Sequence, residues 1–311
     1  MKFTHRSLPL KEIVFDDHTF CLSYPCRAMN LISSIDLVGI INPPVVREVA
    51  EGYQIVCGRG RLEAARKLGH AETICKVLPP WVDDLSCLAI AFEENITTRG
   101  FNLVEKALVV EKFLNYLPDE EVIKNVLPRL GLKPHYHHLE TLQKINFLED
   151  EAKKLLATEE LNPQVAVKLL DWDEKSRQSF LKLVSELRLS FSRQREILEL
   201  LEDWHRKEGL SPAEILEGEE IRECLIDEKL NPPQKAERLQ QILRERLYPT
   251  LEEAKKRLET INKKLAREGA RLRPSPSFEK NFWRLEVIFQ NVQELQEKWP
   301  QLLAQLSHLE D

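Results

Sequence analysis

The chain has 311 residues, of which 42% are hydrophobic and 31% are charged. Such values are typical of folded globular proteins and exclude an intrinsically disordered chain. The formal net charge is −6, which excludes a protein that is basic throughout, so any contact with nucleic acid depends on a local patch.

The N-terminus leads into no apolar signal core, and no run of roughly 18 apolar residues could cross a membrane. The expected location is therefore the cytoplasm. The cysteines are scattered and form no CxxC pair, so we expect buried, reduced thiols and no structural zinc site. They are Cys21, Cys26, Cys57, Cys75, Cys87 and Cys224.

The first part of the chain alternates between helix-like and strand-like patterns. The apolar spacing of residues 30–38 predicts a helix, whereas Pro43-Pro44 requires extended chain. Residues 50–52 read as the turn of a β-hairpin. Strands are predicted over residues 45–49, 53–57 and 73–78, and helices over residues 30–38, 61–68 and 84–94. Residues 1–100 are thus expected to form an α+β domain.

From Asn102 onward the pattern is helical. Asn102 and Glu105 have the spacing of a capping box, which predicts the start of a long helix. Helices are predicted over residues 102–117, 119–130, 134–147, 151–157, 163–169, 174–187 and 192–207. Residues 101–209 are therefore expected to form an all-α middle domain.

Residues 210–311 are expected to form a mainly helical domain with a short β element. Helices are predicted over residues 233–247, 249–267 and 291–309, the last interrupted at Pro300. Residues 271–278 contain two prolines and are not expected to be helical. The alternation of apolar and polar residues from Trp283 predicts a half-buried strand. Apolar residues of this segment would form either a self-association face or a small core: Trp283, Phe289, Trp299, Leu302, Leu303 and Leu306.

The segment around Gly58-Arg59-Gly60-Arg61 carries the clearest chemical pattern. A strand enters a glycine turn that opens a helix, and the first helical turn leaves N–H groups free for an anion. Residues 57–78 hold five basic and two acidic side chains. The pattern favours a phosphate site, although a solvated glycine turn would look the same.

Three motifs in order resemble the ParB family. The turn and its helix match at Gly58, Arg61, Ala64, Ala65 and Gly69. Upstream, Ser34-Ile35, Gly39 and residues 42–47 resemble a second family box. Downstream, residues 94–102 resemble a third. The resemblance covers about residues 10–205 and implies a ParB/sulfiredoxin-type N-terminal fold followed by a ParB/KorB-type helix-turn-helix domain.

In that family the three boxes bind CTP with magnesium. Carried onto this chain, the resemblance implies binding of CTP or another nucleotide with magnesium. The residues implied are Pro43, Arg47, Gly58, Arg59, Gly60, Arg61, Glu94 and Asn95. Glu94 is also the candidate catalytic residue.

The chain departs from the family pattern in two of the boxes. The turn has Arg59 and Gly60 where relatives have Glu and Arg, and Thr98 stands where an arginine is usual. Sulfiredoxin, which shares the fold, has a reactive cysteine inside the turn, where this chain has Arg59. At most weak CTP hydrolysis is therefore expected, and Cys57 on the preceding strand is expected to be a core thiol.

Residues 119–147 have the pattern of two short helices joined at Gly131. Val122, Val126 and Leu130 would face inward from the first helix, and Leu139, Leu142 and Ile145 from the second. In ParB relatives the second helix contacts DNA. The candidate DNA-binding residues are Lys133, His135, Tyr136, His137, His138 and Lys144. An ordinary helical hairpin is the alternative. A metal site at His135 and His138 is not expected, because the nearby sequence offers no third ligand.

The sequence thus predicts a nucleotide-regulated, ParB-like DNA-binding protein related to chromosome or plasmid partitioning factors. Its expected partners are double-stranded DNA, a nucleotide and a second copy in a homodimer, and no membrane is expected. One alternative is a nucleotide hydrolase or small-molecule kinase built on the same fold, in which Glu94 positions a metal or acts as a base. A scaffold with a vestigial pocket is the other.

Overall fold

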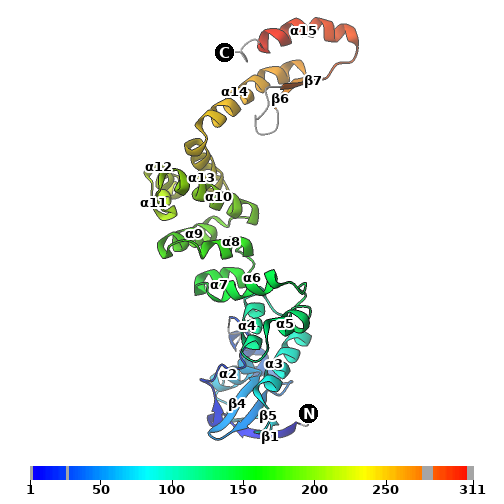
Figure 1. Cartoon of the computed structure of the whole chain (residues 1–311), viewed down its shortest axis with the longest axis vertical. Coiled ribbons are helices and arrows are strands. Elements are labelled where there is room, and N and C mark those ends of the chain that lie inside the picture. The colour runs from blue at the N-terminus through cyan, green and yellow to red at the C-terminus, as the bar shows by residue number, and fades with distance from the viewer. Residues whose placement is uncertain (1–2, 26–27, 275–282, 307–311) are drawn as a thin grey trace. The chain divides into compact units, whose positions relative to one another are not determined.

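A computed structural model of the chain describes residues 3–25, 28–274 and 283–306. The chain divides into two compact units, Met1–Arg195 and Glu196–Asp311, and Figure 1 labels many of their elements. The domain boundaries expected near residues 100 and 209 stay a prediction. Within the described residues, none of the helices is both long and apolar enough to span a bilayer.

The first unit contains a five-stranded mixed sheet. Its strand order is β1-β5-β3-β4-β2, with β3 antiparallel to β4 and parallel to β5. The strands are β1 (Thr4–Pro9), β2 (Ile13–Val14), β3 (Val45–Val49), β4 (Gly52–Cys57) and β5 (Glu72–Leu78). The α+β character predicted for this part is confirmed.

Two strands of the sheet carry no clear sequence signal. β1 exposes most of its residues, so it lacks the apolar alternation that marks a half-buried strand. β2 is only two residues long and pairs with β4 at Tyr53 and Gln54. Both are edge strands, which long-range pairing specifies more than local pattern does.

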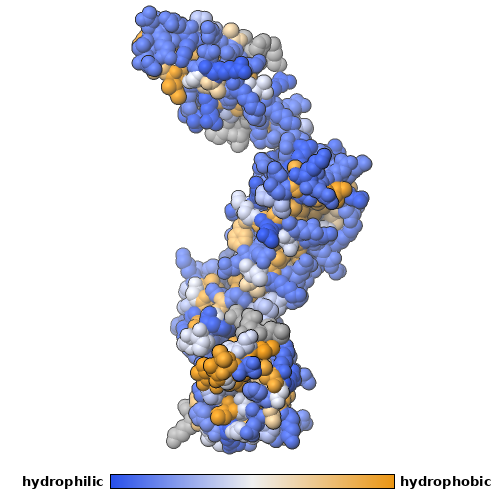
Figure 2. All heavy atoms as spheres, turned by 180° about the vertical axis from the view of Figure 1, so that it is seen from behind, coloured by the Kyte–Doolittle hydropathy of each residue, from blue (hydrophilic) through white to orange (hydrophobic). Residues whose placement is uncertain are grey.

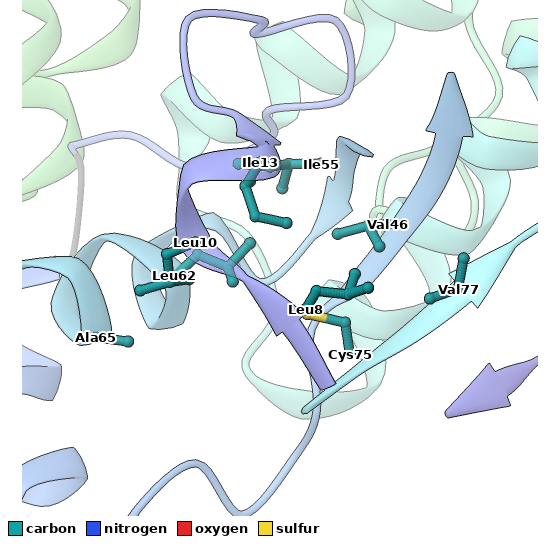
Figure 3. Close-up of a cluster of buried hydrophobic side chains, with 9 residues drawn as sticks. All are labelled: Leu8, Leu10, Ile13, Val46, Ile55, Leu62, Ala65, Cys75 and Val77. Atoms are coloured by element: carbon teal, nitrogen blue, oxygen red, sulfur yellow. The ribbon is translucent and has the colours of Figure 1, made fainter. Parts of the chain in front are cut away.

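Both faces of the sheet are covered. Ile55 and Val56 are neighbours on β4 and point to opposite faces, yet both are buried. On one face, α2 (Arg59–Lys67) packs Leu62 and Ala65 onto residues from every strand (Figure 3). The sheet-side members of this core cluster are Leu8, Leu10, Ile13, Val46, Ile55, Cys75 and Val77.

Two further helices complete the surroundings of the sheet. α1 (Ala28–Val38) packs along α2, and α3 (Asp84–Thr98) contacts β4. α3 runs four residues beyond the predicted end at Glu94. The extension carries Asn95 and Thr98 on helical turns instead of a loop.

A buried carboxylate fixes the start of α4 (Leu103–Leu114). The predicted capping box is present, with Asn102 accepting from the Glu105 N–H and the Glu105 carboxylate accepting from the Asn102 N–H. The Glu105 side chain is fully buried and also accepts from Arg99 Nη1 at 2.8 Å and from the Tyr24 N–H at 3.1 Å. One carboxylate therefore ties together the end of α3, the start of α4 and residue 24.

The rest of the first unit is helical. The elements after α4 are α5 (Asp119–Glu121), η2 (Val122–Val126), α6 (Tyr136–Asn146), α7 (Asp150–Ala157), α8 (Pro163–Leu169), α9 (Glu174–Leu187) and α10 (Phe191–Glu208), which continues into the second unit. The helix predicted over residues 119–130 is present over residues 119–126, so it ends earlier than predicted and is not α-helical throughout. After one turn of α-helix the chain forms a π-helix, in which the Leu127 N–H donates to the Val122 carbonyl.

The second unit combines helices with one hairpin. Its helices beyond α10 are α11 (Pro212–Leu216), α12 (Glu219–Ile226), α13 (Pro232–Leu247), α14 (Pro249–Leu265), η3 (Ala266–Glu268) and α15 (Val292–Leu306). Strands β6 (Ala270–Pro274) and β7 (Trp283–Val287) pair antiparallel. Residues 275–278 and 307–309, included in the predictions for this segment, lie outside the described residues, as does Cys26.

The predicted interruption at Pro300 is wrong, because α15 continues through it. A proline inside a helix removes one hydrogen bond and strains the preceding turn. Here Leu302, two residues later, is fully buried against Leu265, Ala270 and Leu272. Tertiary packing of the apolar side of α15 therefore outweighs the local preference.

We predict that Glu105→Ala lowers the free energy of unfolding by about 3–5 kcal/mol, because it leaves Arg99 without its buried partner. Denaturant unfolding measures this change. Glu111→Ala is the matched control, since Glu111 is exposed on the same helix and its loss should cost less than about 0.5 kcal/mol. Equal effects of the two substitutions would contradict the structural role of Glu105.

Candidate functional site

The glycine turn between β4 and α2 forms one end of a pocket. Gly58 caps α2 with φ of +87°, a left-handed conformation that favours glycine. A Cβ at this position would also lie 2.9–3.0 Å from the Arg61 guanidinium. The Arg61 and Leu62 N–H groups both turn back to the Gly58 carbonyl, so the free donors of the helix start are those of Arg59 and Gly60.

Arg61 joins this turn to α3. Its Nη2 donates to Glu94 Oε1 at 2.6 Å, and its Nη1 donates to the Asn42 carbonyl at 2.7 Å. Both side chains are mostly buried, with 18% of Arg61 and 29% of Glu94 exposed. The two predicted residues therefore meet, 33 positions apart in the sequence.

Arg59 points in a different direction from Arg61. Its Nη1 donates to the Phe15 carbonyl at 2.5 Å, and its Nη2 donates to the Asp17 carbonyl. Glu63 lies 3.6 Å away on the next turn of α2. Arg59 thus fixes residues 15–25, which we call the wall segment, against the start of α2.

The wall segment closes one side of a pocket of about 630 Å³. The other walls come from α1 and the loop after it, the end of β4, the start of α2 and the end of α3. The lining residues are His18, Phe20, Cys21, Leu22, Ser23, Leu31, Ser34, Ile35, Gly39, Ile40, Ile41, Asn42, Ile55, Val56, Cys57, Gly58, Arg59, Gly60, Arg61, Glu63, Glu94, Asn95, Thr98 and Arg99.

The pocket has a charged end and an apolar side. Three arginines and two glutamates gather around the turn, whereas isoleucine and leucine side chains from α1 and its loop form the opposite lining. Ile41, one of these lining residues, is 77% exposed. Figure 2 shows hydrophobic surface gathered on one face of this unit. Such a cavity suits a ligand that combines an anionic group with a flat apolar part.

Six of the predicted nucleotide-binding residues line the pocket together: Gly58, Arg59, Gly60, Arg61, Glu94 and Asn95. Pro43 and Arg47 are not among the lining residues. Arg47 instead donates to Gln54 Oε1 and to the Val82 carbonyl, and it pairs with Asp84 at 2.7 Å. Pro43 is half-buried directly after the lining residue Asn42.

The wall segment was not anticipated from the sequence. It has no helical or strand periodicity, and distant basic side chains hold its backbone. Lys112 of α4 donates to the His18 and Thr19 carbonyls, and Arg99 donates to the Ser23 hydroxyl. No local signal could reveal contacts made by residues more than 70 positions away.

Arg99 lies at the end of α3 and reaches the pocket despite its shifted place in the third motif. Its Nε donates to Asn95 Oδ1 at 2.9 Å, and the Asn95 amide nitrogen donates to the Ala91 carbonyl. The amide of Asn95 is thus fixed in one orientation by its two partners.

Cys57 is the buried thiol at the end of β4 and is only 5% exposed. Burial, and next the negative charge of Glu94, raise the pKa of its thiol to about 11. The thiol is therefore protonated at neutral pH, which is unfavourable for the nucleophilic chemistry of sulfiredoxin.

Five of the predicted DNA-binding residues lie just before or in the first turn of α6, and Lys144 lies in its last turn. Lys133, His135, Tyr136 and His137 are exposed, and His138 is half-buried. Lys144 pairs with Glu140 at 2.9 Å on the same helix. The inward residues of the hairpin are buried as predicted: Val122, Val126, Leu130, Leu139, Leu142 and Ile145. Within the described part of the chain, these histidines belong to no group of three potential metal ligands.

Part of the chain is similar in sequence to known ParB proteins. Residues 26–96 match the ParB N-terminal domain. The probable chromosome-partitioning protein ParB of Vibrio cholerae is 31% identical over 133 residues, which is 42% of this chain and 43% of that protein. The nucleoid occlusion protein of Halalkalibacterium halodurans is 33% identical over 116 residues, which is 34% of this chain and 38% of that protein. Each match therefore spans less than half of the relative.

Among solved structures, a C-terminally truncated chromosome-partitioning protein ParB from Caulobacter crescentus, complexed with CTP-γ-S, is 24% identical. The match covers 59% of this chain and 99% of that one, with a TM-score of 0.27.

We predict that iodoacetamide labels Cys57 far more slowly than Cys21 in the folded protein at pH 8. With a pKa of about 11, roughly one Cys57 thiol in a thousand is ionised at that pH. Cys21 is only partly buried and lines the same pocket. Mass spectrometry of the two peptides gives the rates, with denatured protein as the control. Equal labelling in the folded state would show that Cys57 is accessible and reactive.

Proposed function

We propose that this chain, whose residues 26–96 carry a ParB N-terminal domain, is a ParB-like DNA-binding protein that acts in chromosome or plasmid partitioning. Its pocket would bind a nucleotide, and CTP is the ligand that the family resemblance implies. Nucleotide binding would regulate how the helical part engages DNA.

One observation carries the nucleotide part of the proposal. Gly58, Arg61, Glu94 and Asn95 come from two separate motifs and line one pocket, beside a helix start with free N–H groups. The volume of about 630 Å³ is far larger than a single phosphate requires, and the apolar side could accept a base and sugar. These features support an organic phosphate ligand over an inorganic anion.

Several features of the hairpin support the DNA part. Lys133 and the aromatic or imidazole side chains at the start of α6 are exposed, as a helix that enters the major groove requires. Permanent positive charge is limited, because Lys144 is paired with Glu140 and Arg129 with Glu93. We therefore expect modest non-specific affinity and a shallow dependence of that affinity on salt, because few of the described cations of the hairpin are free to neutralise phosphates.

A homodimer and residence in the cytoplasm complete the proposal. In the second unit Trp283, Phe289, Trp299 and Leu303 remain 42–50% exposed and could form a self-association face. Leu302 and Leu306 pack into the core with Leu265 instead. The second copy would then add a second hairpin, as for proteins that bind two half-sites.

An enzymatic role is the second candidate. Glu94 lines the pocket, where a general base or metal ligand would be needed for hydrolysis or phosphoryl transfer. Its carboxylate is held by Arg61, which favours binding over rapid turnover. The resemblance also implies magnesium, which would have to use the carboxylates and the side-chain amides that line the pocket.

We predict that Arg61→Ala weakens nucleotide binding by about 1–3 kcal/mol, the range for losing a charge-assisted hydrogen bond. Calorimetric titration with CTP measures the change. Lys67→Ala is the matched control, because Lys67 is an exposed cation at the other end of α2 and outside the pocket. An unchanged affinity of the Arg61 variant would remove Arg61 from the site.

We predict that the protein shifts duplex DNA in gels at about 50 mM salt. Lys133→Ala should reduce the slope of log affinity against log salt concentration by about one, the value for one lost phosphate contact. Lys182→Ala removes the same charge from α9, away from the hairpin, and should leave the slope unchanged. Absence of binding to any duplex at low salt would end the DNA proposal.

A further inference from the structure

The donor groups beside the glycine turn test whether magnesium suits this pocket. Magnesium in nucleotide sites uses one or two carboxylates together with phosphate oxygens and water, at short distances and in octahedral geometry. Around the turn, the carboxylates that line the pocket are those of Glu63 and Glu94, and the side-chain amides are those of Asn42 and Asn95.

Both carboxylates and the Asn95 amide oxygen are already bound by an arginine. Glu94 accepts from Arg61 at 2.6 Å, and Asn95 Oδ1 accepts from Arg99 at 2.9 Å. Glu63 pairs with Arg59 at 3.6 Å. Within the ranges that the structure describes, no cluster of three His, Cys, Asp or Glu side chains could hold a metal ion.

Two of these arginines have further anchors. Arg59 holds two carbonyls of the wall segment, and Arg99 holds the buried carboxylate of Glu105. Neither can turn away to release its partner without breaking those bonds. Among the residues that the structure describes, Arg61 donates only to Glu94 and, in one exposed contact, to the Asn42 carbonyl. Arg61 is therefore the arginine that can most easily exchange its present hydrogen-bond partner for a ligand.

A cation and an anion would meet this arrangement differently. A divalent cation would have to share its oxygen ligands with arginines or displace them, and in either case it would lie close to several guanidinium groups, which repel it. A polyphosphate would instead replace Glu94 as the anion bound by Arg61. That exchange keeps the arginine paired and forms a bidentate charged contact.

We infer that the pocket binds its nucleotide without a divalent cation, with arginine side chains in place of magnesium as the charge partner of the phosphates. This inference rests on the proposed nucleotide function. In the bound state the phosphate takes the Arg61 contact that Glu94 holds in the free protein. Glu94 therefore competes with the ligand and does not support a metal.

The two possible roles of Glu94 predict opposite changes in nucleotide affinity when its charge is removed. If Glu94 were a magnesium ligand, removing its charge would weaken binding. If it competes for Arg61, the same change frees the guanidinium and strengthens binding. Glu94→Gln keeps the size and shape of the side chain and removes only its charge. A change in affinity therefore reports the effect of that charge.

The experiment is calorimetric titration of the full chain with CTP, once in EDTA and once in millimolar magnesium. We expect dissociation constants in the two buffers to agree within about threefold. Binding seen only with magnesium would overturn the inference and leave the nucleotide function intact. Absence of CTP binding in both buffers would overturn the nucleotide function and this inference with it.

In both buffers, Glu94→Gln should lower the dissociation constant by up to about tenfold. A rise of about tenfold or more in the magnesium buffer would overturn the inference. Glu93→Gln is the matched control, because Glu93 is the neighbouring carboxylate on α3, pairs with Arg129 and does not line this pocket. It should leave the dissociation constant unchanged. Thermal unfolding of both variants separates an altered pocket from a misfolded chain.

Discussion

The ion pair between Arg61 and Glu94 is the contact on which the pocket depends. It joins the first turn of α2 to the last turns of α3, two helices that the sheet holds in place separately. Without this pair, the glycine turn and the third motif would be two unrelated surface features. With it, the start of one helix and the end of another face the same cavity. The buried carboxylate of Glu105 serves the same purpose behind the pocket, where it fixes Arg99.

Much of the fold follows from local pattern. The hairpin of β3 and β4, the helix after the glycine turn and the capping box at Asn102 were all predicted because short-range chemistry specifies them. β1 was missed because its residues are exposed and only its pairing with β5 makes it a strand. The π-helix at Val122–Val126 and the unbroken α15 at Pro300 show packing outweighing local preference.

The candidate site was likewise predictable from the sequence only in part. The motif residues from Gly58 to Arg61 could be proposed from the sequence, because a glycine turn before a helix has a defined geometry. The direction of each arginine could not, since Arg59 and Arg61 are two positions apart and bind opposite sides of the turn. The wall segment could not be found either, because Arg59, Arg99 and Lys112 hold it from far along the chain.

The anchoring of the wall segment by Arg59 has an evolutionary consequence. The guanidinium donates to the carbonyls of residues 15 and 17, which lie 44 and 42 positions away. A glutamate, which the ParB pattern has at this point of the turn, only accepts hydrogen bonds and could not replace those donors. Exchange at position 59 therefore demands a compensating change around residues 15–17. Across relatives, the identity of the turn residue and the sequence of that distant stretch should covary.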